Sequence, residues 1–183
     1  MKKSLITGMM LAFLPWMVMG QGKYLTNNGS ISFYSHTALE DITAQNNEAA
    51  CVIDAMSGEV VIIVKMTAFQ FEKKLMEEHF NENYVESEKY PKATFKGIIT
   101  NNHELDYASR GIYKVNVEGD MTIHNKTNPV AAEGTIEVTS EGITARTRFL
   151  LNPEDYDIRI PKVVRNNIAD NMEISVELPC KPI

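Results

Sequence analysis

Metal-binding side chains are scarce in this sequence. Its 183 residues include two cysteines, Cys51 and Cys180, and four histidines, and no second histidine stands at the spacing of a metal-binding pair. Because a structural zinc site needs about four ligands, two distant cysteines without a neighbouring histidine do not form one. The sequence therefore predicts no metal site.

Enzyme motifs are lacking as well. The chain has no Gly-x-Ser-x-Gly nucleophile turn and no glycine-rich phosphate-binding loop. An enzyme acting on an apolar substrate would need a buried polar pair, and the residues predicted to face inward supply only Tyr113 and Thr147. We therefore expect neither a catalytic site nor a cofactor.

Basic residues are too few to bind polyanions. The formal net charge is −6, with 18 basic and 24 acidic residues, and no basic stripe is present. An acidic protein repels phosphate backbones and anionic membrane surfaces, so nucleic-acid binding and electrostatic membrane docking are both disfavoured. The sequence leaves the oligomeric state open, a homodimer included.

The N-terminus has the pattern of a secretory signal. Lys2 and Lys3 precede an apolar run from Leu5 to Val18, and Gly20 offers a small residue at a cleavage site. The run is too short and wrongly flanked for a membrane span, so we expect residues 1–20 to be removed and no span to follow. The mature chain, residues 21–183, then loses two lysines and no acid, and its net charge becomes −8. We expect it in the periplasm or outside the cell.

An exported protein can hold a disulfide. Cys51 and Cys180 would form the one pairing that two cysteines allow. The alternative is that both stay as thiols, with Cys51 serving as a small apolar residue.

Period-two alternation of apolar and polar residues is the main structural signal. From Ile112 to His124, one face carries Tyr113, Val115, Val117, Gly119, Met121 and Ile123, and the other is polar. This is the pattern of a strand with one buried face. It recurs around residues 31–34, 50–54, 93–100, 135–139, 143–149 and 173–178.

Two segments differ from this pattern. Residues 60–66 are almost wholly apolar, which predicts a strand covered on both faces, by a helix on one of them. Residues 72–83 carry Leu75, Met76, His79 and Phe80 at three-to-four spacing, which predicts a helix of about three turns. A weaker helical pattern covers residues 163–169.

Seven or eight short strands with one apolar face each must bury those faces together. A barrel or a sandwich does this, and closure into a barrel also removes exposed sheet edges. With tight turns at Ser57-Gly58 and Glu141-Gly142, we expect an all-β, single-domain, closed antiparallel barrel of about eight strands, with one or two short helices. An interior of that width either fills itself with side chains or holds one small ligand. Periodicity alone does not decide between the two.

Two motifs resemble those of one family. They are Tyr90-Pro91-Lys92-Ala93-Thr94-Phe95-Lys96, and residues 117–124 followed by Thr127, Pro129 and Val130. Both resemble hallmark stretches of the YceI family, over about residues 29–178. Asn125 stands where a glycine is usual in the family, Asn128 where lysine is common, and Met121 replaces leucine.

The resemblance implies a lipocalin-like barrel that binds a long isoprenoid chain, such as a polyprenyl lipid or a quinone tail, as an exported carrier or storage protein. The alternative is a filled barrel acting as an exported stress or protein-interaction module. For the lipid-binding hypothesis, alternation gives candidate lining residues, with the helix region near the opening. They are Phe33, Phe69, Phe71, Phe80, Tyr84, Phe95, Tyr113, Val115, Val117, Met121 and Phe149.

Overall fold

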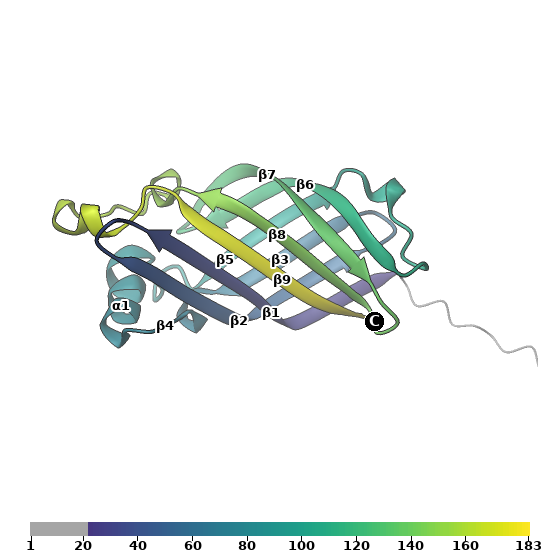
Figure 1. Cartoon of the computed structure of the whole chain (residues 1–183), viewed down its shortest axis with the longest axis horizontal. Coiled ribbons are helices and arrows are strands. Elements are labelled where there is room, and N and C mark those ends of the chain that lie inside the picture. The colour runs from purple at the N-terminus through teal and green to yellow at the C-terminus, as the bar shows by residue number, and fades with distance from the viewer. Residues whose placement is uncertain (1–21) are drawn as a thin grey trace, which may run out of the picture.

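A computed structural model describes residues 22–183 (Figure 1). The predicted signal segment, residues 1–20, lies outside the described residues. Within the described part, no helix is long and apolar enough to cross a membrane.

Nine antiparallel strands form one sheet. Their bounds are β1 (Lys23–His36), β2 (Asp41–Asp54), β3 (Glu59–Lys65), β4 (Gln70–Phe71), β5 (Lys92–Ile99), β6 (Gly111–Ile123), β7 (Lys126–Val138), β8 (Ile143–Leu151) and β9 (Met172–Pro182). The strand order is β1-β9-β8-β7-β6-β5-β3-β2-β4, and β1 also pairs with β2. That last pairing closes eight strands into a barrel, and the two-residue β4 extends the sheet beside β2. The predicted closed antiparallel barrel is confirmed.

The short helical segments other than η3 gather at one end of the barrel, and η3 lies at the other end, beside the turn between β2 and β3. The helix α1 (Lys74–His79) continues as a π-helical turn, η2 (Phe80–Tyr84), which confirms the helix predicted over residues 72–83 with a shift of about two residues. The 3₁₀ segments are η1 (Met66–Ala68), η3 (Asn102–Glu104), η4 (Pro153–Tyr156) and η5 (Lys162–Asn167). Figure 1 shows α1 at the left-hand end of the barrel.

The prediction of a doubly covered strand over residues 60–66 is wrong. In β3, Val60 and Val64 are buried, whereas Val61 and Ile63 on the other face are 37% and 39% exposed. β-Branched residues favour a pleated strand even where one face meets solvent, so an apolar run does not by itself require a second covering layer.

The turn between β6 and β7 explains one departure from the family motif. Its two residues, His124 and Asn125, both have positive φ, 51° and 63°. Two-residue hairpin turns require this left-handed backbone, in which glycine is easiest and asparagine is the best-tolerated alternative. Asn125 can therefore form the turn for which the family usually has a glycine.

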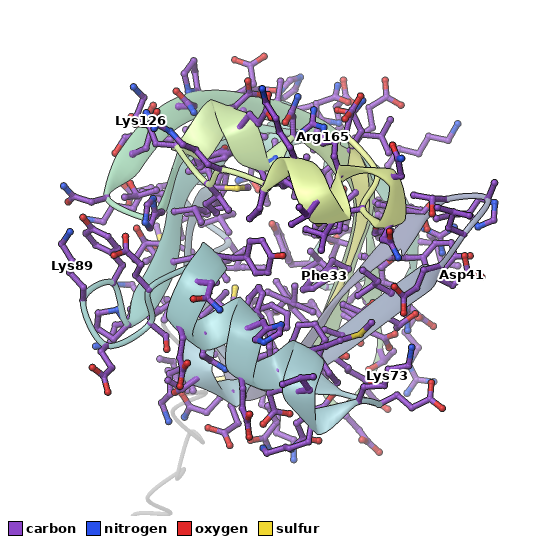
Figure 2. The ribbon with its side chains drawn as sticks, turned by 90° about the vertical axis from the view of Figure 1, so that its left-hand side faces the viewer. Phe33, Asp41, Lys73, Lys89, Lys126 and Arg165 are labelled. Atoms are coloured by element: carbon purple, nitrogen blue, oxygen red, sulfur yellow. The ribbon has the colours of Figure 1, made fainter. Side chains whose placement is uncertain are left out.

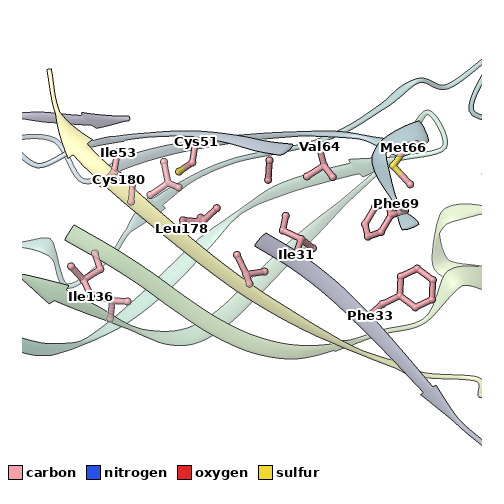
Figure 3. Close-up of a cluster of buried hydrophobic side chains, with 14 of the residues drawn as sticks. Ile31, Phe33, Cys51, Ile53, Val64, Met66, Phe69, Ile136, Leu178 and Cys180 are labelled. Carbon is pink, nitrogen blue, oxygen red and sulfur yellow. The ribbon is translucent and has the colours of Figure 1, made fainter. Parts of the chain in front are cut away.

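One end of the barrel interior is filled. Ile143, Cys51 and Cys180 are fully buried there, and Figure 3 shows Cys51 and Cys180 away from Phe33 and Phe69. The two thiols are free and share a hydrogen bond, which together with burial raises the pKa of Cys51. The disulfide stays a prediction.

We expect Cys51 and Cys180 to be joined in protein purified from its own host, because the predicted export would bring two neighbouring thiols into an oxidising compartment. The intact mass should then be two hydrogens below that of the reduced chain, and denatured, unreduced protein should take up no maleimide. Two maleimide labels per denatured chain would show instead that both cysteines remain as free thiols.

Two glycines bring strands β5 and β6 close together. Gly97 and Gly119 lie opposite each other, and a Cβ on Gly119 would press into the backbone of Gly97 and Lys96. A Cβ on Gly97 would meet the ring of Phe95, so this ring lies along the barrel wall. The two strands therefore approach each other closely at this level.

Replacing Gly119 by alanine should therefore destabilise the barrel by about 1–3 kcal/mol, since backbone must move to admit the methyl group. Gly111→Ala is the matched control on the same strand, because its added Cβ would meet nothing nearer than 3.5 Å. Urea denaturation measures both. Equal stability of the two variants would contradict the close approach.

Candidate functional site

A cavity of about 370 Å³ occupies the part of the barrel nearest α1. Its wall is formed by inward-facing side chains of the barrel strands, by α1 and η2, and by the segment between β8 and β9. Almost all of these side chains are apolar. Pockets for small ligands commonly have volumes of about 300–1,000 Å³. The interior is thus filled at one end and hollow at the other.

Ten of the eleven predicted lining residues lie on the wall of this cavity. They are Phe33, Phe69, Phe71, Phe80, Tyr84, Phe95, Val115, Val117, Met121 and Phe149. Tyr113 is not on the wall. Its hydroxyl donates to the carbonyl of Ser109, 3.0 Å away, near the start of β6.

Tyr113 was assigned to the lining because it shares the inward face of β6 with Val115 and Val117. Alternation gives the face of a strand but not the direction in which a long side chain extends. Tyr113 lies opposite Ile136, which does line the cavity. The Tyr113 ring extends instead toward Gly111 and Ser109, away from the cavity.

Four phenylalanines form an aromatic cluster beside the cavity: Phe33, Phe69, Phe71 and Phe80. The ring of Phe33 lies 5.6–5.7 Å from the other three, and the Phe71 and Phe80 rings are 5.1 Å apart. Such tilted and edge-to-face contacts are the favoured geometry of aromatic pairs. The cluster joins β1 and β4 to η2, so it fixes the helical segment on the barrel.

Glu40 holds together three segments around the end opening. Its carboxylate accepts from Lys73 Nζ at 2.7 Å and from Asn167 Nδ2 at 3.1 Å. These two hydrogen bonds lower the pKa of Glu40. The β1–β2 turn, the start of α1 and η5 are therefore tied to one another. Figure 2 looks onto this end, with Lys73 and Arg165 on opposite sides and Phe33 between them.

His124 makes a second tie. Its Nε2 lies 2.8 Å from Glu86 Oε2, its Nδ1 lies 3.2 Å from the carbonyl oxygen of Tyr156, and the Tyr90 ring packs edge-on at 4.5 Å. The hydrogen bond to His124 lowers the pKa of Glu86. This histidine thus has structural partners on two loops. Across the described residues 22–183, no group of three or more His, Cys, Asp or Glu side chains could hold a metal ion.

Sequence reasoning missed the loop between β8 and β9 as part of the wall. Ile158, Ile160, Val164 and Ile168 line the cavity, and Pro153 and Tyr156 are buried beneath them. An apolar residue stands at almost every second or third position of this loop, which could have indicated that it faces the interior. The charged residues between these positions made the pattern hard to recognise.

The closed ring of strands and the apolar interior define a hollow, lipocalin-like barrel. A family model described as YceI-like domain matches residues 23–180. The chain therefore belongs to the YceI-like domain family. No curated protein gave a significant match.

Solved structures share the fold at low sequence identity. A polyisoprenoid binding domain from Saccharophagus degradans, implicated in plant cell wall breakdown, has a TM-score of 0.78 at 13% identity, covering 89% of this chain and 99% of that one. BcnA of Burkholderia cenocepacia gives 0.67 at 17% identity, covering 82% and 94%. A YCEI protein of Campylobacter jejuni gives 0.60 at 13% identity, covering 81% and 88%.

Side chains are packed more closely in the aromatic cluster than along the cavity wall. Substitutions at the two places should therefore lower the free energy of unfolding by different amounts. Phe33 is buried among three rings, so Phe33→Ala should cost about 3–5 kcal/mol. Phe149 borders the cavity and is only half-buried, so Phe149→Ala should cost about 1–2 kcal/mol. Denaturant unfolding of the ligand-free protein measures both. An equal cost would indicate a solidly packed wall.

Proposed function

We propose that this protein binds a long apolar lipid, an isoprenoid chain such as a polyprenyl lipid or a quinone tail, inside the barrel. It would act without catalysis, as an exported carrier or storage protein in the periplasm or outside the cell. The observation that carries the proposal is the apolar cavity of about 370 Å³. The polyisoprenoid binding domain with the same fold supports it.

The apolar wall can supply the required free energy. Burying a CH₂ group contributes about 0.8 kcal/mol, so three isoprene units of five carbons contribute about 12 kcal/mol. Association costs roughly 4–15 kcal/mol, and micromolar affinity corresponds to about 8 kcal/mol. A tail must therefore bury most of a chain longer than three units, which an elongated barrel allows better than a shallow cleft does.

The alternative, a filled barrel acting as an interaction module, needs an interior closed by its own side chains. The hollow end next to α1 favours the lipid instead. Filling that space artificially is the direct way to separate the two functions.

Ala132→Trp should fill the cavity, because Ala132 is an inward-facing wall residue of β7. We expect the affinity for a fluorescent geranylgeranyl probe to fall at least about tenfold, equivalent to about 1.4 kcal/mol. Asn116→Trp is the control, since Asn116 is exposed on the outer face of β6. Native mass spectrometry of protein from its own host should also detect a co-purified prenyl chain. Repeated absence of any lipid, with the probe unbound, would overturn the proposal.

A further inference from the structure

The barrel wall has a gap between β7 and β8, which are neighbours in the sheet (Figure 1). The two strands pair only from Gly134–Thr147 to Val138–Ile143, although β7 begins at Lys126 and β8 ends at Leu151. At the edge of this ladder, Thr147 Oγ1 donates to the carbonyl of Glu133 at 2.6 Å. Beyond that contact the two strands are no longer paired.

The far side of the gap is closed by η4. The side chain of Asn128 donates to the carbonyl of Asp155 at 2.7 Å, and His124 lies 3.2 Å from the carbonyl of Tyr156. The gap therefore has a fixed outline made by β7, β8 and η4. We call it the lateral window, and its edges are Val130 and Ala131 on β7 and Phe149, Leu150 and Leu151 on β8.

A second hollow lies in the lateral window, and residues from both faces of the sheet line it. Val130, Phe149 and Leu151 also line the interior cavity. Ala131 and Leu150 belong to the outer face, and Leu150 is 70% exposed. The hollow and the interior cavity thus share three wall residues, so these side chains alone separate the window from the cavity.

The window edge on β7 is polar. The two-residue turn makes Ile123–Lys126 a hydrogen-bonded pair of the β6–β7 ladder, so residues 129, 131 and 133 direct their backbone groups away from β6. Pro129 has no N–H to offer there, whereas Ala131 presents both N–H and carbonyl to the window. One donor and one acceptor suit a hydroxyl or a carbonyl group.

Charge around the window disfavours an anionic ligand group. Glu133 and Asp155 are exposed acids beside it. The nearby Arg148 on β8 lies 3.4 Å from Glu173 and donates to Ser175. Glu40 is an acidic side chain at the end opening. In contrast to the acids at the window, its carboxylate already accepts hydrogen bonds from Lys73 and Asn167.

Resting on the proposed function, we propose that the lateral window seats an uncharged, oxygen-bearing head group, such as an alcohol or a quinone ring, while the apolar tail lies in the barrel. The tail makes the interior contacts and the head hydrogen-bonds to the free edge of β7. A phosphorylated head group would meet the neighbouring carboxylates instead.

The position of the head group can be measured with geranylgeraniol esterified by an anthraniloyl fluorophore. A nitroxide label is attached to Leu150→Cys at the window, to Leu75→Cys on α1 at the end opening, or to Ile112→Cys. Ile112 is the matched control, because it is also on the outer face and also 70% exposed. Unmutated protein treated with the same reagent controls for labelling of Cys51 and Cys180.

We expect the label at residue 150 to quench most of the bound fluorescence, and the labels at residues 75 and 112 to quench little. Geranylgeranyl diphosphate should bind about tenfold more weakly than geranylgeraniol, because of repulsion by the nearby acids. Stronger quenching from residue 75 than from residue 150 would place the head at the end opening and overturn the window assignment, with lipid binding intact. Failure of unlabelled protein to bind any probe would overturn both proposals.

Discussion

A closed ring of eight strands fixes the width of this barrel, and everything else depends on what fills that width. A ring of this size has room for packed side chains or for one ligand. At one end, Cys51, Ile143 and Cys180 are fully buried and fill the space. Nearer α1, the inward-facing side chains leave a cavity of about 370 Å³. The same closed wall therefore encloses a packed core at one end and a cavity at the other.

At the hollow end, the loops are held by the aromatic cluster and by polar side chains that join one loop to another. Glu40 joins α1 to η5, and His124 joins the β6–β7 turn to Glu86 and Tyr156. Hydrogen bonding lowers the pKa of both Glu40 and Glu86. Such groups stabilise the fold above the ordinary carboxyl pKa, and the stabilisation is lost as the pH falls through the folded-state value. The rim of the cavity thus loses part of its stabilisation as the pH falls.

Period-two alternation predicts strands that each bury one face, which a barrel or a sandwich satisfies, and the resemblance to the YceI family favours the barrel. Alternation also gives the inward face of β6 correctly, but it does not say where a long side chain extends, so Tyr113 does not lie on the cavity wall as predicted. The apolar run of β3 misled for another reason: Val61 and Ile63 reflect strand preference rather than burial. The lateral window was not predictable, because residues 126–133 pair with β6 on one side whether or not β8 follows them on the other. Whether a neighbouring strand follows them depends on the path of η4.

The filled end constrains how a ligand can lie. A tail cannot pass the packed residues around Cys51, Ile143 and Cys180, so a lipid longer than the cavity must keep its head at an opening nearer α1. The end opening is crossed by segments that Glu40 ties together, and using it requires those hydrogen bonds to yield. The gap between β7 and β8 requires no bond to break, because the ladder already ends at Gly134 and Thr147. The wall is incomplete between β7 and β8, whereas hydrogen bonds hold the rim at the end of the barrel closed. This difference favours a head group at the side of the barrel over one at its end.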